Sequence, residues 1–258
     1  MMGIGQIFIK EGYAYPSVGL IWIVTESVTT FLMPLVFAAA GGDRFGGMTR
    51  GDIAAYYVWL LPVGSFVVCH FMWEIATEIK EGQFSAQLVR PMDFFLFTFV
   101  RNLAWRAFRV TLTLPVFGLA WWFYADMMKD VPLHFGPGFW VVLLLGHCVS
   151  VAFVLMLSMV ALFVQEATSI FELYYIPMLF LSGQIVPIAA LPDWARSVAM
   201  AFPFYYTTAA PLDLIVGRLP MSSWPSIAAI QLAWCVGSYG VGRILWRYGL
   251  RHYTGVGM

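Results

Sequence analysis

The most apolar stretch of the chain reads FWVVLLLGHCVSVAFVLMLSMVALFV and runs from Phe139 to Val164. It contains no lysine, arginine, aspartate or glutamate. A helix needs about 20 predominantly apolar residues to cross the hydrocarbon core of a bilayer. The stretch therefore predicts a transmembrane helix, and similar apolar runs lie on both sides of it along the chain.

The composition of the whole chain extends this prediction. Its 258 residues are 61% hydrophobic and only 11% charged, with a mean hydropathy of +0.79. Soluble domains are about 45–50% apolar and about 25% charged, so this chain has too few charges to cover a water-facing globule. At about 20 residues per crossing, it has room for about six helices and for no sizeable soluble domain. This excludes an ordinary soluble enzyme and a disordered chain.

We expect an all-α polytopic membrane protein that forms one domain over residues 1–258. Its six predicted spans cover about 18–40, 53–75, 95–125, 139–164, 170–186 and 224–245. Before the first span, apolar residues at helical spacing predict a helix that lies along the cytoplasmic membrane surface up to Pro16.

The distribution of charge predicts the orientation. Six spans put both termini on one side, and a cytoplasmic location places nine lysines and arginines inside and five outside, as the positive-inside rule favours. The 14 basic residues are balanced by 14 acidic ones, so no general nucleic-acid footprint is present. The three cysteines have neither disulfide nor metal-ligand spacing.

The predicted cytoplasmic loop over residues 74–93 has the densest charge in the chain. Gly82 can end one helix in the left-handed conformation, and Pro91 prevents the next helix from continuing. A short amphipathic helix is expected between them, with Phe84 and Leu88 on one face. This segment is either a solvated loop or a knob that docks into a groove of another protein.

Ionisable side chains also fall inside two predicted spans. Three arginines of the third span lie within about 140° of one helical face, at 100° per residue. They either reach the headgroups as anchors, or form a basic lining for an anionic substrate or lipid headgroup, or pair with Glu166 and Glu172. The glutamate of the first span faces either a partner helix or a translocation cavity. The candidate lining residues are Glu26, Arg101, Arg106 and Arg109.

Catalytic patterns are missing from the sequence. His70 and Glu74 are four residues apart, but no H-E-x-x-H zinc motif and no G-x-S-x-G nucleophile elbow occurs. None of the three lysines stands in a G-K-[ST] phosphate loop. His147, near Ser150 in the fourth span, fits a polar contact between helices better than catalysis. We therefore expect no enzyme activity of the chain's own.

The sequence after the fifth span is unusual for a membrane protein. It reads FLSGQIVP up to Pro187, then LPDW from Leu191, then PFYY from Pro203. Glycine and proline break helices here, and non-helical backbone at membrane depth is tolerated only where protein or water satisfies it. We expect a half-entering outer hairpin over 187–220. Its shaping residues are Gly183, Pro187, Leu191, Pro192, Trp194 and Pro203.

The successive patterns G-x-x-x-P, L-P-x-W and P-x-x-Y after the fifth span resemble those of the permease subunits of ABC-2 type bacterial exporters. The loop EGQFSAQLVRP, from Glu81 to Pro91, is similar to the cytoplasmic coupling segment of that family. The ending YGLRHYTGVG, from Tyr248, is similar to the C-terminal tail of one bacterial branch. The resemblance covers nearly the whole chain, but no residue selects a substrate.

The resemblance implies a permease subunit in the bacterial plasma membrane that exports a substrate with ATP hydrolysed by a separate subunit. Two permeases, identical or different, would pair around a central path above two ATPase subunits, which would bind ATP and Mg. No cofactor would bind this chain. The implied coupling residues are Glu81, Gly82, Phe84, Leu88, Arg90 and Pro91.

Two other hypotheses remain open on the sequence alone. One is an ion-coupled secondary transporter or channel that uses Glu26, because a carboxylate inside a span is a natural ion or proton carrier. The other is an intramembrane, lipid-modifying enzyme that uses His147 or His70. The absence of nucleophile and metal patterns weighs against the enzyme.

Overall fold

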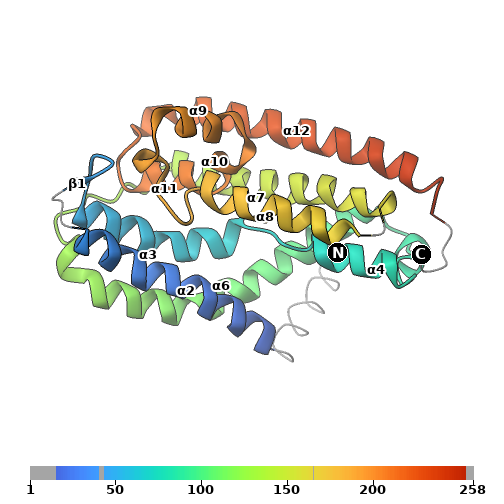
Figure 1. The fold of residues 1–258 in the computed structure, drawn as a ribbon, viewed down its shortest axis with the longest axis horizontal. Helices are drawn as coiled ribbons and strands as arrows, with labels where there is room; N and C mark the ends of the chain where they lie inside the picture. Colours follow the sequence, from blue (N-terminus) through green and yellow to red (C-terminus); the bar gives the residue numbers. More distant parts are fainter. Residues whose placement is uncertain (1–15, 41–43, 165, 254–258) are drawn as a thin grey trace.

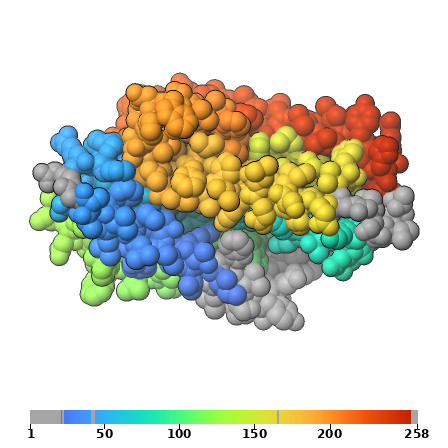
Figure 2. Space-filling model, viewed as in Figure 1, coloured from blue at the N-terminus to red at the C-terminus, as the bar shows by residue number. Residues whose placement is uncertain are grey.

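The computed structural model describes residues 16–40, 44–164 and 166–253, so the expected leader helix before Pro16 and the tail after Tyr253 lie outside it. Figure 1 shows the long helices of the described part lying along the long axis of the molecule, and the space-filling view in Figure 2 shows the same elongated outline. They are α2 (Pro16–Ala39), α3 (Arg50–Val67), α6 (Phe94–Met128), α7 (Pro137–Ser158), α8 (Ala167–Leu181) and α12 (Trp224–Gly249). The fold is all-α, as predicted, apart from one two-residue strand pair.

Shorter elements connect the long helices. At one end of the molecule lie α4 (Met72–Lys80) and α5 (Ser85–Leu88), and at the other lies the hairpin of β1 (Arg44–Phe45) and β2 (Met48–Thr49) (Figure 1). The turn η1 (Met159–Leu162) extends α7. Between α8 and α12 the chain forms η2 (Ile188–Ala190), α9 (Asp193–Ala201), α10 (Pro203–Thr207), α11 (Ala209–Ile215) and η3 (Met221–Ser223).

Two helical stretches of the described residues are long and apolar enough to cross a membrane, Arg50–Lys80 and Pro137–Leu162. The stretch Ile23–Ala39 and helix α8 are apolar but shorter. Helices α6 and α12 have sufficient length, but their arginines and other polar residues lower the hydropathy. By length and composition, the structure therefore contains two clear spans where the sequence predicts six.

Helices α3 and α8 end well inside the corresponding predicted spans, whereas α7 only passes into the turn η1 near the end of the predicted span 139–164. The predicted span 53–75 is divided, because α3 ends at Val67 and α4 begins at Met72. Helix α8 ends at Leu181, inside the predicted span 170–186, because Gly183 adopts a φ of +78°. The second difference has a local cause in glycine, whereas the segment between α3 and α4 contains neither glycine nor proline.

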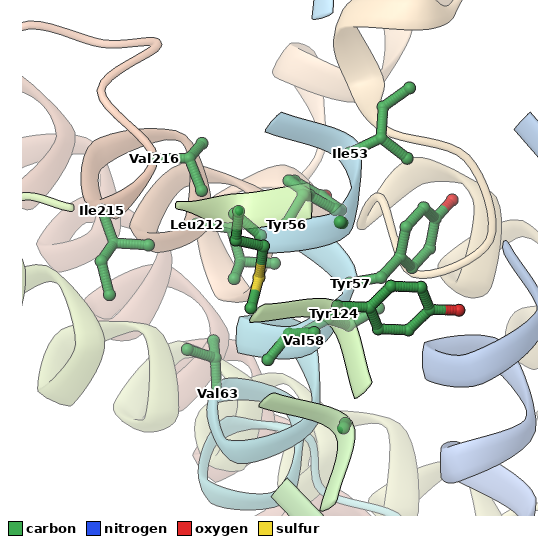
Figure 3. Packing of buried hydrophobic residues seen from close by; sticks show 14 of the residues in the cluster. Ile53, Tyr56, Tyr57, Val58, Val63, Tyr124, Leu212, Ile215 and Val216 are labelled. Carbon is green, nitrogen blue, oxygen red and sulfur yellow. The ribbon is translucent and has the colours of Figure 1, made fainter. Parts of the chain in front are cut away.

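Helix α3 is enclosed by other elements of the chain. It packs against α2, α6, α7 and α11, and apolar residues occupy nearly all of its sides, as a fully buried helix requires. Figure 3 shows Tyr56 and Tyr57 of α3 close to Tyr124 of α6 and to Leu212 of α11. Residues from four helices thus form one core around α3.

The tyrosines of α3 also hold the non-helical turn after α8. The Tyr56 hydroxyl donates to the carbonyl of Gly183 at 2.9 Å, and the Tyr57 hydroxyl donates to that of Ile185 at 2.6 Å. The carbonyl of Ser182, the residue before Gly183, accepts a hydrogen bond from the Thr208 hydroxyl. Side chains therefore satisfy backbone groups that lipid would leave unpaired.

The prolines of the predicted outer hairpin stand at the starts of its short helices. Pro187 and Pro192 directly precede η2 and α9, and Pro203 is the first residue of α10. Leu191 links η2 to α9, and Trp194 on α9 is 73% exposed. Proline favours these positions because it lacks the amide that the first turn of a helix leaves unpaired.

We predict that Gly183→Ala destabilises the folded protein by about 3 kcal/mol. The new Cβ would lie 2.4 Å from the Tyr56 hydroxyl oxygen, on a residue with positive φ. Thermal unfolding in detergent measures the effect. The control Gly118→Ala, where a Cβ meets open space on α6, should be neutral or stabilising by up to about 1 kcal/mol. Equal effects of the two substitutions would contradict the prediction.

Candidate functional site

Polar side chains from three helices meet inside the molecule. Arg106 and Arg109 extend from α6, and both are almost fully buried. Nη2 of Arg109 lies 2.5 Å from Oε1 of Glu26 on α2. The Ser65 hydroxyl on α3 bonds both Glu26, at 3.2 Å, and the Thr113 hydroxyl, at 2.9 Å. We call these five residues the buried charge cluster; it joins α2, α3 and α6.

Arg101 does not belong to this cluster, although the sequence groups it with the other arginines. Its guanidinium faces α4, 3.5 Å from Glu78 and 3.8 Å from Glu74. Glu166, considered as a partner for the arginines, instead pairs with Lys80 at 3.1 Å. The candidate lining residues therefore separate into a buried set and one arginine near the end of the molecule that carries α4.

A second group of polar contacts lies where α3 ends. The amide of Cys69 donates to the Ser150 hydroxyl of α7 at 3.0 Å, and Nη1 of Arg106 donates to the carbonyl of Ser65 at 3.0 Å. The Cys69 thiol donates to Oδ1 of Asn102 at 3.3 Å. Sequence reasoning missed Ser65 and Asn102, because their roles depend on how α3 and α6 lie relative to each other.

The two histidines considered as catalytic groups lie among aromatic rings. The His147 ring is buried, with its centroid 5.1 Å from that of Phe66 and 6.2 Å from that of Phe99. The His70 ring lies 5.5 Å from Tyr175 and 6.1 Å from Trp73. Packing of this kind fits a structural role for both residues.

The predicted coupling segment forms a tight turn and a short helix. Gly82 adopts a φ of +75°, which lets α4 end and α5 begin within a few residues. Phe84 is 0% exposed, which corrects the prediction that it shares an exposed face with Leu88. Its ring packs edge-on against three others, those of Phe94, Trp246 and Tyr253. Residues of the same chain, in α6, in α12 and just after α12, therefore cover this ring.

The residues after Phe84 form the exposed tip of this segment. Leu88 is 38% and Val89 83% exposed, an unusual pair of apolar side chains for a charged loop. The Arg90 guanidinium lies 4.5 Å from the centroid of the Phe97 ring. Glu81, also exposed, accepts a hydrogen bond from Gln83. Pro91 follows the tip, in the turn that leads to α6.

Asp93 fixes the return of the chain into α6. Its carboxylate accepts hydrogen bonds from the first amides of α6 and pairs with Arg243 of α12 at 2.5 Å. Burial raises the pKa of Asp93, but hydrogen bonds from Arg243 and from the amide of Leu96 lower it more, so it falls below its ordinary value. The ionised carboxylate thus ties the start of α6 to α12.

Comparison with protein families decides what kind of molecule carries these features. The family described as ABC-2 family transporter protein matches residues 23–257. The chain belongs to this family. Comparisons with curated proteins and with solved structures found no match.

Membership in the ABC-2 family makes the chain a polytopic membrane protein and the membrane component of a transporter. A permease of this family lacks an ATPase domain, and membership in the family implies an ATPase partner. Across residues 16–40, 44–164 and 166–253, no three histidine, cysteine, aspartate or glutamate residues are grouped to hold a metal ion.

We predict that Glu26→Gln lowers the free energy of unfolding by about 3 kcal/mol, because it leaves the buried Arg109 charge uncompensated. The double substitution Glu26→Gln with Arg109→Gln should cost less than the sum of the two single ones. Titration with a denaturing detergent measures all three. Thr25→Ala, an exposed neighbour whose hydroxyl bonds only its own helix, is the control. Strictly additive losses would refute the coupling.

We predict that Phe84→Ala destabilises the protein by about 3–5 kcal/mol, as expected for a fully buried aromatic ring. Leu88→Ala, four residues along the same segment and partly exposed, should cost less than about 1 kcal/mol. Thermal unfolding of the two purified variants compares them. Similar stability of both variants would mean that Phe84 is not seated as described.

Proposed function

We propose that the chain is the permease subunit of an ATP-driven exporter in a bacterial plasma membrane. The family match over residues 23–257 carries this proposal. Two copies, or this chain and a sister permease, would surround a central path across the membrane. Two ATPase subunits, which bind ATP and Mg²⁺, would dock against the cytoplasmic ends of the helices.

The tip of the α4–α5 segment is the proposed docking surface. Leu88 and Val89 offer exposed apolar area beside the charges of Glu81 and Arg90, a combination that suits a polar-rimmed protein interface. Phe84 anchors the tip in the aromatic cluster beneath it. A firmly mounted tip transmits a push from the ATPase to the helices, whereas a loose loop would bend.

The placement of basic residues supports a cytoplasmic location for this end. In Figure 1 the C-terminal end of α12 and the α4 region lie toward one end of the molecule, and β1 lies at the other. The last turns of α12 and the residues just after it carry Arg243, Arg247 and Arg251, a bias expected of cytoplasmic ends. The hairpin over 187–220 then belongs to the outer half of the permease, where an exported substrate would leave.

The ion-coupled alternative has less support from the contacts of its key residue. Glu26 is held by the Arg109 guanidinium and by the Ser65 hydroxyl. A proton carrier has to exchange its partners during each cycle, and this carboxylate can do so only by breaking a largely buried ion pair. The contacts therefore favour a structural role for Glu26.

We predict that the permease, purified in mild detergent, brings with it a chain that carries a phosphate loop and has orthovanadate-sensitive ATPase activity. Leu88→Asp and Val89→Asp should release that chain, because they bury a charge in an apolar contact. Leu88→Met keeps the apolar surface and should retain it. Co-purification and ATPase assays measure the result, and retention of the ATPase by both aspartate variants would refute the docking surface. A permease that purifies intact but alone would refute the ATP-driven function itself.

A further inference from the structure

The four residues between α3 and α4 leave the helical path, although none of them is itself a helix breaker. Sharp helix breaks arise at proline, at glycine or serine, or where a side chain inserts into the hydrogen-bond ladder. Residues 68–71 contain none of those residue types. Pro62 lies inside α3, which continues to Val67 beyond it, so this proline does not end the helix. Gly64 and Ser65 stand in the last turn of α3 and can weaken the helix there, but both are themselves helical. The contacts at the break point to a side chain that has inserted into the hydrogen-bond ladder.

Arg106 is that side chain. In an unbroken helix the amide of Cys69 would donate to the carbonyl of Ser65, four residues earlier. Instead, the Arg106 guanidinium occupies this carbonyl at 3.0 Å, and the Ser150 hydroxyl accepts from the Cys69 amide at 3.0 Å. Two side chains from α6 and α7 thus replace one helical hydrogen bond.

The broken conformation is well satisfied as it stands. Arg106 is 2% exposed and places its positive charge at the C-terminal end of α3, where the helix dipole is negative. The Cys69 thiol donates to Asn102 and to the carbonyl of Val67. Three of these four bonds, however, join α3 or the segment after it to α6 or α7. Displacement of α6 or α7 relative to α3 would therefore remove them.

We propose that Arg106 is a positioning residue, which holds α3 and α4 apart until release of the Ser65 carbonyl lets the two join into one helix. This inference rests on the proposed function, because α4 leads directly into the docking tip. Joining would produce a continuous helix over the 31 residues Arg50–Lys80, a stretch whose composition already suits one membrane span. Movement of the ATPase would thereby reach the enclosed core around α3.

A distance measurement between α3 and α4 tests the two conformations. Spin labels on Arg50→Cys and Thr77→Cys, both exposed positions, report the separation of the two helices. Cys148 and Cys235 are replaced by alanine, and Cys69 is retained because it is buried. A continuous helix places positions 50 and 77 about 40 Å apart, at about 1.5 Å per residue. Backbone outside a helix can rise by about 3.3 Å per residue, so the break should give a distance that differs from this value in the spin-labelled protein without further substitutions.

Two substitutions should shift this distance toward that of the continuous helix in the purified permease. Arg106→Met removes the guanidinium from the Ser65 carbonyl, and Ser150→Ala removes the acceptor of the Cys69 amide. Ser150→Ala, the milder change, should raise the ratio of joined to broken molecules about tenfold, as loss of one buried hydrogen bond predicts. The control is Ser158→Ala on the same helix, whose buried hydroxyl bonds only the carbonyl of Val154, and it should leave the distance unchanged.

The same distance, measured in the complex of the permease with its ATPase, tests the link to function. In the spin-labelled protein without further substitutions, ATP with orthovanadate should shift the distance toward about 40 Å. The Ser150→Ala variant should show that shift before nucleotide is added, and its ATPase activity should remain. If the spin-labelled protein without further substitutions, Arg106→Met and Ser150→Ala all show the same distance, the proposed role of Arg106 is overturned. A complex that hydrolyses ATP without any change in distance would overturn its link to the ATPase. If no ATPase binds, the proposed function fails, whereas the distances in the permease alone still decide the role of Arg106.

Discussion

Hydrocarbon offers no hydrogen-bond partner, so every backbone group at membrane depth has to be paired within the protein. The long helices meet this requirement internally, and two of the places where the described chain leaves them are held by side chains from other helices. One is the turn after α8, where tyrosine and threonine hydroxyls take the free carbonyls. The other is the break after α3, where an arginine and a serine take a carbonyl and an amide. Each departure has its own set of side-chain partners.

Both sets of partners involve the same helix. The half of α3 near its start carries Tyr56 and Tyr57, which hold the turn of the proposed outer hairpin, and its end presents the carbonyl that Arg106 occupies. Helix α3 is also enclosed by α2, α6, α7 and α11. A shift of α3 would therefore be felt both at the hairpin and at the α4–α5 tip. This gives a short physical route between the two ends of the permease.

Local signals made much of the fold predictable. Apolar runs located the long helices, and glycine at 82 and 183 marked turns that do adopt positive φ. Features that depend on contacts between distant segments were not predictable in this way. Arg101 and Arg106 share a helical face in projection, but α4 approaches only the first of them. The four residues after α3 contain no breaker, and Gly64 and Ser65 in its last turn are themselves helical. The positions of α6 and α7 are therefore needed to place the break.

Phe84 illustrates the limit of amphipathic reasoning most directly. An apolar face on a short exposed helix indicates that something covers it, but not whether the cover is a partner or the chain itself. Here Trp246 and Tyr253 cover the ring, and the Tyr253 hydroxyl also lies 3.1 Å from that of Ser85. The proposed docking surface is therefore smaller than the sequence indicated, because it lacks Phe84. It is held in place by more elements, because Phe84 contacts α6, α12 and Tyr253. Force applied at the proposed docking surface would reach α12 as well as α4 and α6, because the Phe84 ring packs against Trp246 of α12 and Phe94 of α6.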